Sequence, residues 1–231
     1  MSALVLGPSS RRAFERMAAD GRRVLGDRFV ALVAYSAADA VLFGERIAAD
    51  DLDALGALAE VWHRDHLATP LVLTLSEFRR SLDAFPIEYQ AMIDGHVLVA
   101  GADPFDGVRV LEADLRRACE IQAKSHLIHL RQGWIEAGGH HEALASLAAR
   151  SAAPLRALLT QLVHLNGLSA ADDAGLAAAA AQLAAVPADV IRAVLSLETA
   201  PAGASALVPR LPEYLEACDR LWAFIDRWRG H

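Results

Sequence analysis

Up to Gly107, short apolar runs alternate with segments whose apolar residues have helical spacing. The apolar runs are rich in strand-forming residues. They lie at 29–36, 40–44, 69–75 and 96–101. The helical patterns lie at 11–26, 50–67 and 76–85, and Ser76 is the expected N-cap of the last. In the second of these, the predicted apolar face consists of Leu52, Leu55, Leu58, Ala59 and Trp62.

Beyond Gly107 the chain shows only helical patterns, separated by glycine- and proline-containing breaks. These patterns predict about five helices in an antiparallel bundle. We therefore expect an α+β protein with two domains. Residues 1–108 form a mixed sheet with flanking helices, and residues 109–231 form an all-α helical bundle.

The composition is typical of a globular protein, with 54% hydrophobic residues in a chain of 231. A net charge of -7 argues against a nucleic-acid partner. The sequence contains no uninterrupted apolar run of roughly 18 residues, and its N-terminal charges follow a short apolar run. We therefore expect a cytoplasmic protein without a membrane partner. Cys119 and Cys218 lie in helical apolar patterns and predict neither a disulfide nor a zinc site.

Four stretches of the sequence, taken together, point to a family. They are "VALVAYS", "TPLVLTLSEFRRSLDAFPIEY", "HVLVAGADPF" and "LRRACEIQAKSHLIHLRQGWI". In this order they resemble bacterial proteins of the nucleotidyltransferase fold, in which a minimal catalytic domain precedes a helical one. The resemblance covers most of residues 25–137 and implies a nucleotidyltransferase-like sheet in the first domain.

The catalytic motif of that family is only partly present. The resemblance implies a Gly-Ser pair after the first strand, which holds the nucleotide phosphates, and an Asp-x-Asp pair that binds Mg²⁺. Ser36 is present, but Tyr35 replaces the glycine and obstructs close backbone approach. Asp39 matches the first acid, whereas Val41 stands where the second is expected, and the run at 69–75 offers no third acid. Ser36 and Asp39 are therefore interpreted as remnants of a catalytic site.

Asp51 and Asp53 have the spacing of a metal-binding pair but occur at the start of a predicted helix. Residues two apart on a helix point about 200° from each other and cannot chelate one ion. We interpret both as acids that favour a helix N-terminus.

Arg117, Lys124 and Arg131 are spaced by seven, which places them nearly on one face of a helix. If the chain retains a ligand site, we predict that these residues bind a nucleotide or another anionic small molecule there, in a cleft between the two domains that the resemblance implies. The hypothesis that a row of charges favours is a solvated face on which Glu120 pairs with Lys124.

Histidines occur in three close pairs, none of which has a third ligand at metal-binding spacing. We interpret them as surface or loop residues and predict no metal site. The pairs are His63 and His66, His126 and His129, and His140 and His141.

These observations predict a degenerate nucleotidyltransferase-fold protein that is not catalytic and binds a ligand or a protein partner. Its apolar helices offer a further alternative, formation of a homodimer. The competing hypothesis is an active enzyme that uses Asp39 to transfer a nucleotide to a small molecule or protein. We expect no cofactor if the protein is not catalytic, and Mg²⁺ if it is an active nucleotidyltransferase.

Overall fold

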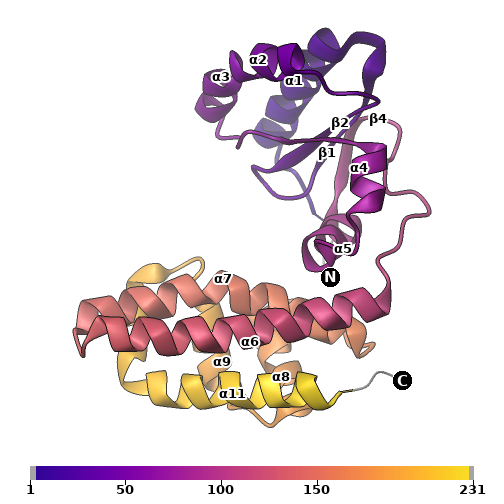
Figure 1. The fold of residues 1–231 in the computed structure, drawn as a ribbon. Helices are drawn as coiled ribbons and strands as arrows, with labels where there is room; N and C mark the ends of the chain where they lie inside the picture. The colour runs from indigo at the N-terminus through magenta and orange to yellow at the C-terminus, as the bar shows by residue number, and fades with distance from the viewer. Residues whose placement is uncertain (1–3, 229–231) are drawn as a thin grey trace. The chain divides into compact units, whose positions relative to one another are not determined.

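The computed structural model describes residues 4–228 and divides into two compact units, with the boundary between Val110 and Leu111 (Figure 1). We call residues 4–110 the N-terminal unit and residues 111–228 the helical unit. The N-terminal unit contains, in order, α1 (Pro8–Leu25), η1 (Gly26–Arg28), β1 (Phe29–Ala34), β2 (Ala40–Gly44), α2 (Ala49–Gly56), α3 (Ala59–Arg64), β3 (Leu71–Thr74), α4 (Leu75–Arg80), α5 (Pro86–Gly95) and β4 (Val97–Gly101). The helical unit contains α6 (Glu112–Ala137), α7 (His141–Leu165), α8 (Asp173–Ala184), α9 (Ala188–Ser196), η2 (Pro201–Gly203), α10 (Ala204–Leu207), η3 (Val208–Arg210) and α11 (Leu211–Arg227).

The four strands form one mixed sheet in the order β3-β2-β1-β4. β1 is antiparallel to both β2 and β4, and β2 is parallel to β3. Ala34 pairs with Ala40, so the turn at 35–39 joins β1 directly to β2. With helices on the sheet and a separate helical unit, the chain has the expected α+β class.

Alternate residues of a strand point to the same side of the sheet. On one side these residues are apolar and pack against α1 and α3. Leu32 of β1 and Leu42 of β2 are buried there with Phe14, Met17 and Trp62. The resulting core fixes the side of the sheet on which α1 lies (Figure 1).

The opposite face is covered by α4 and α5 and is rich in aromatic rings. Phe43 of β2 contacts Phe78 edge-on, with ring centroids 5.7 Å apart, and Phe78 contacts Tyr89 at 4.8 Å. Phe105 completes the group at 6.0 Å from Phe43. We call these four residues the aromatic cluster. Val41 is buried beside them.

The structure corrects two helix predictions. The helix expected over 50–67 is in fact the two helices α2 and α3, which are separated at residues 57–58. Leu52, expected on the apolar face, is 51% exposed. The N-cap of α4 is Thr74 rather than Ser76, because the Thr74 hydroxyl accepts a hydrogen bond from the Glu77 amide at 3.1 Å.

In the helical unit, α6 packs against both α7 and α11, and residues 111–228 contain six α-helices where about five were expected. The buried residues include Leu115, Leu127, Leu155 and Tyr214. Cys119 and Cys218 are buried free thiols. No helix within residues 4–228 has the length and apolar character needed to span a membrane.

Candidate functional site

The turn between β1 and β2 holds the two expected site residues, Ser36 and Asp39. The Ser36 hydroxyl donates to the Asp39 carboxylate, with Oγ 2.5 Å from Oδ2. The same Oγ accepts hydrogen bonds from the amides of Ala38, at 3.1 Å, and Asp39, at 2.9 Å. The Asp39 carbonyl accepts from the amides of Tyr35, at 3.0 Å, and Ser36, at 3.4 Å. Four backbone amides and both polar side chains are thus bonded inside the turn.

This pattern opposes phosphate binding by the turn. Backbone sites for phosphate use N–H groups that are free to point at the anion, usually at the start of a helix. Here β2 begins at Ala40, so a strand rather than a helix follows Ser36. These four amides have partners in the protein, and their use by a ligand requires that those bonds break.

Tyr35 stands in place of the expected glycine and Val41 in place of the second acid, and both side chains pack against apolar groups. Tyr35 is half-buried and packs near the aromatic cluster; burial, and secondarily the charge of Asp39, raises its pKa. Val41 is 1% exposed on the same side of the sheet. The position of the missing acid is therefore filled with apolar atoms.

Asp51 and Asp53 lie on different sides of α2, as expected for a helix. Asp51 lies in the first turn and is buried, whereas Asp53 is exposed. The interpretation of Asp51 as a helix-start acid is confirmed: its Oδ2 accepts from the Ala48 amide at 2.8 Å, and the N-cap Ala48 has no side-chain acceptor of its own.

Asp51 also has a role that the sequence did not predict. Its two oxygens accept from the guanidinium of Arg28, at 2.6 Å and 2.8 Å. The hydrogen bonds from Arg28, followed by the one from Ala48, lower the pKa of Asp51 to about 2. Asp51 is thus a structural ion-pair partner.

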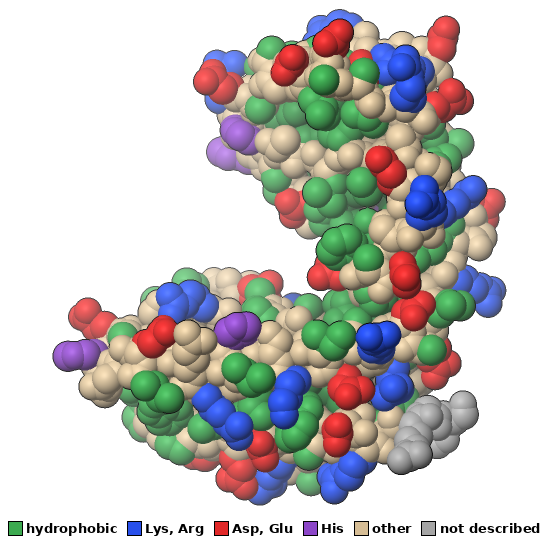
Figure 2. Space-filling model, in the orientation of Figure 1, with side chains coloured by type: hydrophobic (Ala, Val, Ile, Leu, Met, Phe, Trp, Pro, Cys, Tyr) green, Lys and Arg blue, Asp and Glu red, His purple; other side chains and the backbone are tan. Residues whose placement is uncertain are grey.

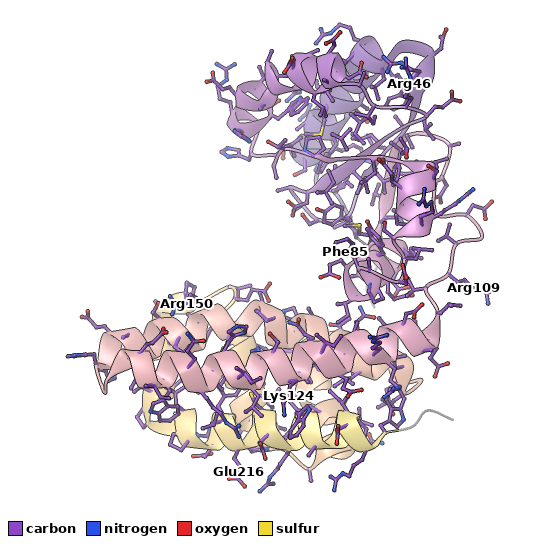
Figure 3. The ribbon with its side chains drawn as sticks, in the orientation of Figure 1. Arg46, Phe85, Arg109, Lys124, Arg150 and Glu216 are labelled. Atoms are coloured by element: carbon purple, nitrogen blue, oxygen red, sulfur yellow. The ribbon has the colours of Figure 1, made fainter. Side chains whose placement is uncertain are left out.

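The row of basic residues expected to bind an anion lies on α6. Lys124 lies over the Trp222 ring of α11, with Nζ 3.4 Å from the ring centroid, and is labelled in Figure 3. Arg131 pairs with Asp219 of α11 at 3.0 Å. Arg117 is exposed.

The alternative hypothesis, a solvated face on which Glu120 pairs with Lys124, is wrong about the pair. Glu120 pairs with Arg116, at 3.4 Å, rather than with Lys124. On the face drawn in Figure 2, acidic and basic side chains of the helical unit are interspersed. Lys124 and Arg131 thus already have partners on α11. Arg117 is therefore the residue of this row whose positive charge is most available to an anion.

His126 was expected at the surface, and this prediction is wrong. The side chain is largely buried between helices, and its Nε2 atom lies 2.6 Å from the hydroxyl of Tyr214. Burial, and secondarily the charge of His129, lowers the pKa of His126 to about 4, so the ring is neutral at pH 7. No local pattern pointed to Tyr214, because it lies 88 residues away.

The other histidines of the three pairs are exposed, as expected. Within the described part of the chain, no three His, Cys, Asp or Glu side chains form a group that could hold a metal ion. Comparisons with known protein families, curated proteins and solved structures give no significant match.

Proposed function

We propose that this chain is a non-catalytic binding protein, which recognises a ligand or a protein partner and whose N-terminal unit is a degenerate nucleotidyltransferase-like domain. The observation that carries the proposal is the closed turn between β1 and β2. There Ser36 and Asp39 bond to each other, and the turn's own groups accept its amide hydrogens.

The chemistry of nucleotidyl transfer supports the same proposal. Two divalent ions about 4 Å apart require carboxylates that converge from neighbouring positions. Asp39 is engaged with Ser36, Val41 is buried in apolar surroundings, and Asp51 is paired with Arg28. Asp39 and Asp51 thus each have a partner within the protein.

The nucleotidyltransferase-like part of the proposal rests on position. Ser36 follows the first strand, and Asp39 precedes a second strand that is antiparallel to it. These are the places at which the resemblance expects a serine and an acid.

The test is incubation of the purified chain with labelled nucleoside triphosphates, Mg²⁺ or Mn²⁺, and small-molecule and protein acceptors. We expect no nucleotidylated product, while an active nucleotidyltransferase assayed in parallel gives one. Metal-dependent transfer that disappears in the Asp39→Asn variant would establish the enzyme instead.

A further inference from the structure

A pocket of about 400 Å³ opens between α6 and α7 of the helical unit. This volume is in the range of small-molecule sites, which often lie between the helices of bundles. Its apolar lining includes Leu147 and Pro154. Its polar lining includes Gln122, Ser125, His126, His129, Arg150 and Ser151.

Pro154 interrupts the backbone hydrogen bonding of α7 where this helix lines the pocket. It lies inside α7 and has no N–H group, so the carbonyl of Arg150, four residues earlier, lacks its helical donor. Ser151 lies in the same turn, is buried, and donates its hydroxyl hydrogen to the Ala148 carbonyl at 2.7 Å. A proline and a serine that bonds to its own backbone both loosen a helix locally, and both line the pocket.

On the α6 side, hydrogen bonds hold the polar side chains in place. The His126 ring is fixed from behind by Tyr214, which is fully buried. The Ser125 hydroxyl lies 3.1 Å from Nδ1 of His129. Each of these side chains keeps hydrogen-bonding capacity for a bound molecule, and the fixed positions reduce the entropy cost of binding.

Arg150 supplies the positive charge of the pocket and is labelled in Figure 3. Among residues 4–228 the structure gives its guanidinium no acidic partner, whereas Arg131 and Arg156 are paired. The pocket also contains Glu136, which accepts a hydrogen bond from Gln132 at 2.8 Å. Glu136 lies seven residues beyond His129, about 10 Å along the helix axis, so an anion near His129 avoids most of its repulsion.

We propose that this pocket binds a small organic phosphomonoester. The guanidinium of Arg150 pairs with the phosphate, and the organic part lies against Leu147 and Pro154. The bonded pair of Ser125 and His129 donates one further hydrogen bond to the phosphate, from whichever of the two side chains keeps its hydrogen free. A phosphate group suits donors that approach from several directions, because its three terminal oxygens are arranged tetrahedrally, whereas a carboxylate offers two oxygens in one plane. The proposal goes beyond the proposed function, because it concerns the helical unit alone and holds whether or not the N-terminal unit transfers nucleotides.

The test is calorimetric titration of the full chain with glycerol 3-phosphate, inorganic phosphate and acetate. We expect glycerol 3-phosphate to bind most tightly, inorganic phosphate more weakly and acetate not measurably. Arg150→Gln should weaken glycerol 3-phosphate binding about tenfold or more, and Ser125→Ala by a smaller factor. Arg12→Gln, an exposed arginine of α1, is the charge-matched control and should leave the affinity unchanged.

A folding defect is recognised by circular dichroism and the unfolding midpoint. It is not expected for Arg150→Gln, because this side chain is exposed. As a second measurement, glycerol 3-phosphate should shift the ring resonances of His129 in the wild-type chain. Equal binding of acetate, or of inorganic phosphate and glycerol 3-phosphate, contradicts the proposed ligand class. Binding that is lost in Arg117→Gln and kept in Arg150→Gln overturns the pocket in favour of the basic row on α6.

Discussion

The Nε2 atom of His126 lies 2.6 Å from the hydroxyl of Tyr214, and this contact links α6 to α11. Tyr214 is fully buried, so its hydroxyl has to find its hydrogen-bond partner inside the protein. A neutral imidazole meets this need, because it has one donor and one acceptor nitrogen. Burial of the ring keeps His126 uncharged in the folded state at pH 7.

His126 should make the stability of the protein depend on pH. Its pKa is about 4 in the folded chain and ~6.5 when unfolded, so the unfolded state binds the proton first as pH falls. The free energy of unfolding should fall between about pH 6.5 and 4, by on the order of 2 to 3 kcal/mol. Urea unfolding across this range measures it.

His126→Gln is the matched variant for this experiment, because it keeps a polar group near Tyr214 but does not titrate. Its stability should be lower at pH 7 and should vary less between pH 6.5 and 4. An unchanged slope would assign the pH dependence to other groups. His141→Gln, at an exposed histidine, controls for the loss of a titratable ring.

The ion pair of Arg28 and Asp51 should act in a more acidic range. The folded pKa of Asp51, about 2, lies below the ordinary value of ~4, so its stabilisation is complete above pH 4 and is lost as pH falls toward 2. Asp51→Asn should lower the thermal midpoint at pH 7 by several degrees, because it leaves Arg28 without its partner. Asp53→Asn, on the exposed side of the same helix, should have little effect. Equal midpoints for the two variants would show that the pair does not stabilise the fold.

Restoring the missing acid at position 41 should damage the fold without creating an enzyme. Val41→Asp places a carboxylate beside Phe43 and Phe78, and we expect a loss of more than about 3 kcal/mol of unfolding free energy. Leu71 pairs with Val41 on the neighbouring strand and is 45% exposed. Leu71→Asp should therefore cost under about 1 kcal/mol. Denaturant unfolding compares the two variants, and a stable Val41→Asp protein with metal-dependent transfer would contradict the proposed function.

Gly101 should be the least replaceable glycine of the sheet. Its φ is +92°, and an added Cβ lies 2.0 Å from the Val30 carbonyl oxygen, a backbone atom that cannot move aside. Gly101→Ala should cost more than about 2 kcal/mol. Gly107 has a φ of +70° but open space around it, so Gly107→Ala should cost only about 1 to 2 kcal/mol. Similar losses for both variants would show that the steric contact is unimportant.

The sequence predicted those features that depend on neighbouring residues. The apolar runs at 29–36 and 40–44 contain β1 and β2, because a strand buried on both faces reads as a continuous apolar segment. The interpretation of Asp51 held because the amides at a helix start are satisfied locally.

Helix phase was predicted less well. In α2 the buried positions are Asp51, which pairs with Arg28, and Leu55, so Leu52 is exposed. A pattern of apolar spacing does not show where a helix stops and starts again.

Only the tertiary structure decided which distant groups become partners. Arg28 and Asp51 are 23 residues apart, and His126 and Tyr214 are 88 apart. No periodicity encodes such pairs, since they depend on how the elements pack. The same holds for the pocket between α6 and α7. Arg150 and Pro154 lie one turn apart on α7, but they line one pocket with His129 of α6 only because the two helices pack together.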